Sequence, residues 1–186
     1  MTQDLIIKTL EAGSDLNLEP VQPAHAESIF HLVDQDRVRL GARLPWVEGT
    51  RTSADTLAFI EDSMKRRNGG GSGDWVIVAR IDERPTIVGV IGLHGLHRTN
   101  RRTEIGYWIA GDFEGRGFVT RAASAVVDHL FDLGFHRLGI NVAADNDRSR
   151  AVAERLGFRF EGVCRGAEFL HGRPIDHAIH ARLRTD

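Results

Sequence analysis

Residues 113–122, FEGRGFVTRA, place Gly115 and Gly117 on either side of Arg116, directly before a stretch with the pattern of a helix. The free N–H groups and positive dipole end of a helix N-terminus bind anions, and glycine lets a ligand approach the backbone closely. Arg116 and Arg121 would reinforce such a site for phosphate. The spacing therefore predicts a phosphate-binding turn, with a plain chain reversal at the two glycines as the alternative.

Two common phosphate-binding motifs do not fit this stretch. A P-loop reads GxxxxGK[ST], and no Gly-Lys pair occurs in the chain. The dinucleotide fingerprint GxGxxG needs a third glycine at position 120, where Thr120 stands. The sequence therefore disfavours an ATP- or NAD-binding protein of these classes.

The elements that would position the turn follow from hydrophobic periodicity. Apolar residues from Val119 to Leu130 recur at helical spacing, which predicts a helix over 116–133 that ends at Gly134. Asn146 is the expected cap of a short helix that ends at Leu156-Gly157. Further helices are predicted from about Pro23 and over Ser53–Lys65 with Ser53 as N-cap, and strands at 16–21, 75–81, 86–93, 103–109 and 137–144, with two more closing the chain. Residues 82–85 are a predicted hairpin turn, and 68–73, NGGGSG, a flexible connector. This order predicts an α/β (α+β) fold with a mixed sheet.

The length of the chain, 186 residues, predicts a single domain that comprises residues 1–186. The chain has 41% hydrophobic and 27% charged residues, which is ordinary for a soluble globular protein. Its formal charge of −2 argues against a nucleic-acid partner, since such domains are usually strongly basic. Cys164 is the only cysteine, and the sequence contains neither a signal-peptide pattern nor an apolar run of membrane-spanning length. We therefore expect a cytoplasmic protein that has no membrane partner.

Two longer segments surround the glycine turn: TEIGYWIAGDFEGRGFVTRAA (103–123) and NVAADNDRSRAVAERLGFRFEGV (141–163). They resemble the GNAT superfamily of N-acetyltransferases, in which backbone amides of a glycine-rich turn hold the pyrophosphate of acetyl-CoA. The family's turn reads Gln/Arg-x-x-Gly-x-Gly/Ala. With Gly117 as its first glycine, Glu114 and Val119 are departures from the pattern at its two ends.

More motifs, in the right order, are similar to those of RimL-type ribosomal-protein N-acetyltransferases. They are Leu44-Pro45-Trp46, Glu104-Ile105-Gly106-Tyr107-Trp108, Asn146 to Val152, Glu161-Gly162, and Ala167-Glu168-Phe169-Leu170-His171-Gly172. The resemblance covers nearly the whole chain. It implies the GNAT fold, a mixed, mostly antiparallel central sheet of about seven strands flanked by about four helices.

The resemblance also implies a reaction: direct transfer of an acetyl group from acetyl-CoA to a primary amine in a ternary complex, without a metal. The attacking amine must lose a proton and the leaving thiolate must gain one. By the resemblance, Glu168 is the expected base and Ser149 the expected acid, while Glu104 is an alternative base. The competing interpretations are an exposed strand residue for Glu168, a polar first-turn residue for Ser149, and for Glu104 an ion pair with Arg101 or Arg102.

The expected ligand contacts come from the turn and the resemblance together. Those to acetyl-CoA are Tyr107, Trp108, Ile109, Glu114, Gly115, Arg116, Gly117, Phe118, Val119, Thr120, Arg121, Asn141, Asn146 and Ser149. Those to the amine substrate are Trp46, as a groove wall, Glu104 and Glu168. His94 and His97 carry no metal-binding motif, and no metal site is expected.

The acceptor expected from the resemblance is the N-terminal α-amine of a protein, of the ribosomal-protein type. A small-molecule amine, such as an amino-acid derivative, a polyamine or an antibiotic, is the first alternative. A non-catalytic acyl-CoA-binding sensor is the alternative of another class, since it would keep the glycine turn without needing Glu168 or Ser149. A homodimer is expected because related enzymes often dimerise.

Overall fold

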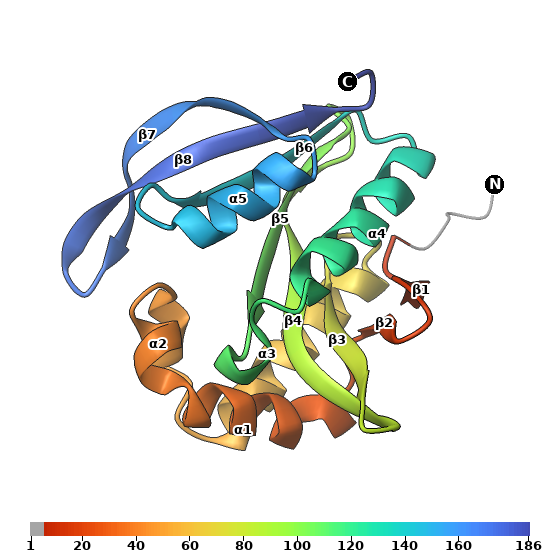
Figure 1. Cartoon of the computed structure of the whole chain (residues 1–186), viewed down its shortest axis with the longest axis vertical. Helices are drawn as coiled ribbons and strands as arrows, with labels where there is room; N and C mark the ends of the chain where they lie inside the picture. The colour runs from red at the N-terminus through yellow and green to blue at the C-terminus, as the bar shows by residue number, and fades with distance from the viewer. Residues whose placement is uncertain (1–5) are drawn as a thin grey trace.

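The computed structural model of the protein describes residues 6–186 and is drawn in Figure 1. One sheet of eight strands runs in the order β1-β2-β3-β4-β5-β6-β8-β7. The strands are β1 (Leu10–Glu11), β2 (Leu16–Pro20), β3 (Asp74–Ile81), β4 (Arg84–His97), β5 (Arg102–Ile109), β6 (Arg137–Ala143), β7 (Arg159–Leu170) and β8 (Arg173–Leu183). The helices are α1 (Ala26–Gln35), α2 (Arg37–Gly41), α3 (Ser53–Asn68), α4 (Phe118–Asp132) and α5 (Asp147–Arg155), with short 3₁₀ helices at Pro23–His25, Pro45–Glu48 and Gly111–Phe113.

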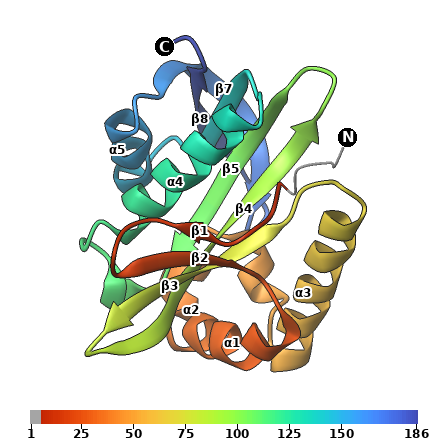
Figure 2. The same ribbon diagram turned by 90° about the vertical axis from the view of Figure 1, so that its right-hand side faces the viewer.

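Helices cover both faces of the sheet because its strands are apolar on both sides. Along β3, Trp75 and Ile77 pack into a cluster that includes α4, whereas Val76 packs with residues of α1 and α3 on the opposite face. Figure 2 shows α4 and α5 on one side of the sheet and α1, α2 and α3 on the other. The predicted fold class, a mixed and mostly antiparallel sheet flanked by helices, is confirmed.

Local residue chemistry explains most element boundaries. The hairpin between β3 and β4 turns at Asp82 and Glu83, whose φ values of 46° and 62° suit a two-residue loop. Gly134, with φ of 86°, ends α4 as predicted. The prediction for α3 was wrong by one residue at its cap. Thr52, not Ser53, is the N-cap, and it exchanges hydrogen bonds with Asp55 in a capping box.

Two elements were not predicted, the two-residue β1 and the five-residue α2. Strand β4 also extends further than the predicted 86–93, to His97. Strands β7 and β8 form a long hairpin whose turn reaches α2, where His171 Nε2 lies 2.9 Å from the carbonyl oxygen of Gly41. No helix within residues 6–186 is long and apolar enough to cross a membrane.

The described sheet has one parallel pairing, between β5 and β6, and this pairing is short. Strand β5 pairs with β6 only over Arg102–Glu104, opposite Arg137–Gly139. Beyond Glu104, β5 keeps its antiparallel partner β4 as far as Ile109, but β6 pairs with β8 alone. The two parallel strands therefore separate after Glu104, and the site lies where they diverge.

Candidate active site

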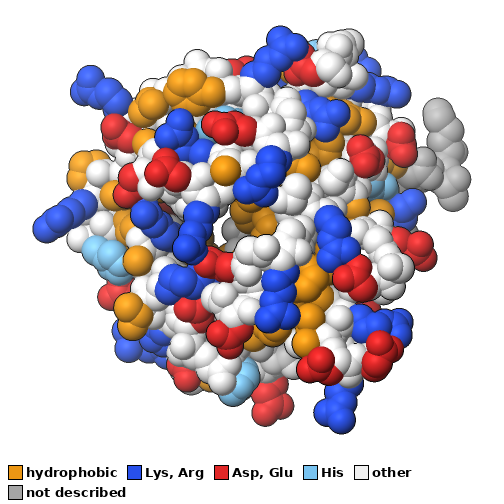
Figure 3. Space-filling model, in the orientation of Figure 1, with side chains coloured by type: hydrophobic (Ala, Val, Ile, Leu, Met, Phe, Trp, Pro, Cys, Tyr) orange, Lys and Arg blue, Asp and Glu red, His pale blue; other side chains and the backbone are white. Residues whose placement is uncertain are grey.

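A cavity of about 1220 Å³ lies where β5 and β6 separate. Tyr107 and Trp108 both line it, although adjacent strand residues point to opposite faces of a sheet. The cavity therefore passes around the free edge of β5 and connects the α4–α5 side of the sheet with the α2 side. Figure 3 shows the surface hollowed near its centre, with Lys/Arg and Asp/Glu side chains around the opening.

The glycine turn borders this cavity. Gly115 and Gly117 have φ values of 73° and 76°, in the left-handed region that favours glycine. No heavy atom lies within 4 Å of the position that a Cβ would take at either residue, so both glycines face open space. Gly117 caps α4 without any side-chain hydrogen bond, and the first intrahelical bond comes from the N–H of Arg121. The three N–H groups before it, at Phe118–Thr120, therefore point out of the helix end as donors for an anion.

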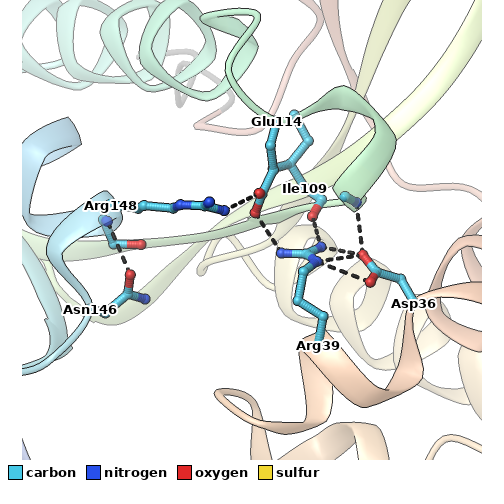
Figure 4. Close-up of polar contacts among 8 residues, drawn as sticks. Asp36, Arg39, Ile109, Glu114, Asn146 and Arg148 are labelled. Atoms are coloured by element: carbon cyan, nitrogen blue, oxygen red, sulfur yellow. Dashed lines mark hydrogen bonds and ion pairs between the residues drawn. The ribbon is translucent and has the colours of Figure 1, made fainter.

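An ion-pair network holds Glu114, which stands in this turn where the family's pattern has Gln or Arg (Figure 4). Arg39 of α2 donates to Glu114 Oε1 and to the carbonyl oxygen of Ile109, both at 2.6 Å, and it also pairs with Asp36. Arg148 of α5 pairs with the second oxygen of Glu114. Burial opposes the charge on Arg39, but the hydrogen bond to Asp36 and the charges of Asp36 and Glu114 together outweigh it and raise the pKa of Arg39. The two guanidinium groups thus offset the negative charge that Glu114 brings to the turn.

Helix α5 is fixed to β5 beside the cavity. Asn146 caps the helix as predicted, because its Oδ1 accepts a hydrogen bond from the N–H of Ser149 at 3.2 Å. The hydroxyl of Tyr107 donates to the carbonyl oxygen of Ser149 at 3.2 Å. Burial raises the pKa of Tyr107 to about 12, so this hydroxyl keeps its proton at neutral pH. Both main-chain groups of Ser149 are therefore held, and the residue lines the cavity.

The residues predicted to contact the amine lie on the other face of the sheet. The rings of Trp46 and Trp108 pack with their centroids 5.9 Å apart. Glu168 Oε2 lies 3.4 Å from Nε2 of His177, in a pair joining β7 to β8. Glu104 lies opposite Gly139, at the point where β5 and β6 separate, and within residues 6–186 it forms no ion pair with Arg101 or Arg102.

Eleven of the predicted site residues line the cavity together: Tyr107, Trp108, Ile109, Glu114, Gly115, Gly117, Phe118, Val119, Thr120, Asn146 and Ser149. The others do not line it. Arg121 pairs with Asp15 at 2.5 Å, and the guanidinium of Arg116 lies over the ring of Phe113. Asn141 lies on β6 opposite Ile179 of β8. Trp46, Glu104 and Glu168 also lie outside its lining.

Sequence reasoning missed the arginines of the cavity, which are Arg39, Arg43, Arg148 and Arg155. On α5 a signal was present, because Arg148 and Arg155 are seven residues apart and share a helix face. Arg155 donates to the hydroxyl of Thr120 at 2.9 Å, beside the exposed helix N-terminus. On α2 no comparable signal existed, because the helix itself was not predicted.

Comparisons with known proteins show the family to which the chain belongs. The model of the acetyltransferase (GNAT) domain family matches residues 15–159. YdaF of Bacillus subtilis, whose name assigns ribosomal N-acetyltransferase activity only provisionally, is 33% identical over 180 residues, 96% of each chain. The ribosomal-protein-serine acetyltransferase of Escherichia coli is 28% identical over 177 residues, 95% of this chain and 97% of the relative.

A solved structure gives the same result for the fold. The microcin C7 self-immunity acetyltransferase MccE, in complex with acetyl-CoA and AMP, superposes with a TM-score of 0.88 at 28% identity, covering 92% of this chain and 94% of the other. Its name, like those of the two relatives, describes an enzyme of acetyl transfer. The chain belongs to the GNAT family of N-acetyltransferases.

Proposed function

We propose that the enzyme transfers the acetyl group of acetyl-CoA to the α-amine of a protein N-terminus, of the type that ribosomal proteins carry. The observation that carries this proposal is the N-terminus of α4, whose first N–H groups bond to no capping side chain and which opens through the glycine turn into a cavity of about 1220 Å³. Similarity over 95% of the chain to a ribosomal-protein-serine acetyltransferase supports a protein acceptor.

In this proposal the pyrophosphate of acetyl-CoA accepts hydrogen bonds from the N–H groups at the start of α4. Arg155, which donates to the Thr120 hydroxyl at this end of α4, offsets part of the phosphate charge, whereas Arg148 is already paired with Glu114. The pantetheine arm lies along β5 beyond Glu104, where β6 no longer pairs with that strand. A main-chain N–H of β5 then stabilises the oxyanion that forms on the thioester carbonyl.

The proton transfers are assigned to groups on opposite sides of the strand gap. The amine nitrogen attacks the thioester carbon and loses a proton through water to Glu168, with Glu104 as the alternative acceptor. As the carbon–sulfur bond breaks, Ser149 donates a proton to the CoA thiolate. Fixed main-chain contacts at Ser149 support this assignment, since they hold the residue at the cavity wall.

A small-molecule amine is the second candidate acceptor. Similarity to an acetyltransferase whose structure contains acetyl-CoA and AMP favours it, since that complex includes a small molecule as well as acetyl-CoA. The proposal also includes a cytoplasmic location, which the sequence pattern predicts, and a homodimer, which the family resemblance implies. Sedimentation of the purified enzyme tests the oligomeric state.

Thermal unfolding with saturating acetyl-CoA, CoA, ATP or NAD tests the cofactor. A ligand at 100 times its Kd stabilises by about 2.7 kcal/mol, which raises the midpoint of a domain of this size by roughly 5–10 °C. We expect this rise with acetyl-CoA and CoA alone. A rise with ATP or NAD only would contradict the proposed cofactor.

Thiol release from acetyl-CoA then tests the acceptor. The panel contains peptides starting with Ser or Ala, the same peptides with acetylated N-termini, spermidine and an aminoglycoside. We expect release with the free peptides, and a lower kcat in Glu168→Gln and Ser149→Ala with unchanged acetyl-CoA affinity. Glu154→Gln, an exposed carboxylate of α5 outside the cavity, is the control. Release with small amines alone would replace the proposed acceptor, and binding without release on any amine would favour a sensor.

A further inference from the structure

Three side chains on the α1–α3 face of the sheet each lie over a glycine of the next strand. They are Asp74 of β3 over Gly92, His94 of β4 over Gly106, and Glu104 of β5 over Gly139. A Cβ at position 106 would lie 2.7 Å from His94 Nε2, and one at position 139 would lie 3.1 Å from Glu104 Cγ. Each glycine therefore makes room for a polar group from its neighbour.

Glycine at position 106 leaves room for the His94 ring to lie over β5. Gly106 is not among the residues with positive φ, so its backbone conformation is open to any residue. A side chain there would collide with the imidazole, since the His94 Cδ2 atom would lie 2.9 Å from its Cβ. The absence of a side chain at Gly106 thus lets the His94 ring lie against β5.

This ring completes a row of chemical groups along β5. Residues two apart on a strand share a face, so Glu104, Gly106 and Trp108 lie in one line. Because Gly106 has no side chain, the imidazole of His94 occupies its position. The line therefore presents a carboxylate, an imidazole and an indole, beginning where β5 and β6 separate and ending at Trp108, which lines the cavity.

Charge and exposure suit this row to handling protons. His94 and Glu104 are both exposed, so protons can exchange with solvent. On the other side of His94 lies buried Asp74, whose charge is paired with Arg66 of α3 at 2.9 Å. Burial raises the pKa of Asp74, while the hydrogen bond to Ser63 and the charges of Arg66 and His94 lower it. Glu104 lies directly opposite His94 across β4 and β5, so it is the second carboxylate beside the imidazole.

We propose that His94 is a proton acceptor of the amine site, held over Gly106 between Glu104 and Trp108. Its Nε2 is a further acceptor, beside Glu168 and Glu104, for the proton that the amine nitrogen loses as the C–N bond forms, and it takes this proton directly or through one water. The imidazolium then returns this proton to solvent, while the thiolate is protonated from the α5 side. This inference rests on the proposed function, which places the amine on the side of the sheet that carries Glu104 and Trp108. It applies equally whether the amine belongs to a protein or to a small molecule.

His94→Ala is the first test, with His31→Ala, an exposed histidine of α1, as the matched control. The rate is measured with whichever amine of the panel is acetylated fastest, so a wrong acceptor class leaves this test intact. We expect kcat to fall by roughly 10- to 100-fold, towards the lower end of general-base effects because carboxylates remain. Acetyl-CoA affinity should stay unchanged. Added imidazole should restore part of kcat in His94→Ala and none in Glu104→Gln.

Gly106→Ala is the second test, because it displaces the ring and leaves the histidine in the chain. We expect it to lower kcat nearly as far as His94→Ala does, and to have little further effect in the double variant. Such non-additivity is the signature of two residues acting through one contact. Wild-type kcat in His94→Ala, or additive losses in the double variant without imidazole rescue, would overturn the proposal.

Discussion

At the scale of single residues, the site depends on backbone conformations that only glycine adopts at low cost. Gly115 and Gly117 both have positive φ, and both face open space beside the exposed N–H groups of α4. A side chain at either position would strain the backbone and would also project next to the anion-binding donors. Strain and ligand exclusion are separate effects, and the two ends of α4 allow them to be separated.

Gly117→Ala should lower the free energy of unfolding by about 1 kcal/mol and weaken acetyl-CoA binding at least tenfold. Gly134→Ala is the matched control, because Gly134 lies at the other end of α4 with φ of 86° and open space around it. It should cost similar stability without changing affinity. Urea unfolding and calorimetric titration measure the two quantities. Equal affinities in both variants would show that the turn does not hold the cofactor.

At the scale of elements, a buried hydrogen bond helps to hold α5 on the sheet. Tyr107 of β5 donates to the carbonyl oxygen of Ser149, and burial raises the pKa of its hydroxyl to about 12. The unfolded chain would release this proton near the ordinary value of about 10. The folded state therefore binds the extra proton between these values, and its stability is complete below pH 10 and falls as the pH rises towards 12.

This loss should amount to roughly 2–3 kcal/mol between pH 10 and 12. Tyr107 is the only tyrosine of the chain, so its ionisation can be followed directly by ultraviolet absorbance. Tyr107→Phe should be less stable at pH 7 but should lose less stability over the alkaline range. An absorbance midpoint near 10 in the folded protein would contradict the buried hydrogen bond.

Elements defined by local chemistry were predictable, and elements defined by distant contacts were not. Gly134 and Asn146 act through neighbours within one helical turn, so their roles follow from sequence. Thr52 was missed because Ser53 beside it is an equally good cap, and only Asp55 three residues after Thr52 distinguishes them. Helix α2 is too short for a periodic signal, and its Arg39 is 75 residues from its partner Glu114.

The candidate site likewise has a part that was predictable from local sequence and a part that depends on distant contacts. The turn at 115–120 was predictable because its donors belong to one short segment. The imidazole of His94 over Gly106 was not, because it depends on the register of β4 against β5. A sequence gives alternation within a strand, but it does not give which residue of the next strand lies opposite.

At the scale of the whole molecule, the two largest hydrophobic clusters lie on opposite faces of one sheet. Trp75 lies in the cluster under α4, whereas Trp108 packs against the cluster of α1 and α3. If the helices of either face came away, one apolar side of the same strands would be exposed to water. We therefore expect residues 1–186 to unfold as one domain in a single cooperative step.

Circular dichroism and tryptophan fluorescence should consequently give the same urea midpoint. In Trp75→Phe the remaining tryptophans report on the α1–α3 side of the sheet. In the double variant Trp46→Phe with Trp108→Phe, the remaining Trp75 reports on the α4 side. Both reporters should follow the midpoint of circular dichroism in the same variant. Two separated transitions would show that the faces unfold independently.

The short pairing of β5 with β6 has a mechanical consequence for the enzyme. Strands β1–β5 form one ribbon and β6–β8 another, and the sheet hydrogen bonds between them span only Arg102–Glu104 and Arg137–Gly139. Beyond this short seam the two ribbons share no strand pairing, and α4 lies in the chain segment that connects β5 to β6. A substrate arm lying along β5 beyond the seam would brace one ribbon against the other. Bound acetyl-CoA would then contribute part of the rigidity of the catalytic scaffold, and this contribution would be lost and regained with each turnover.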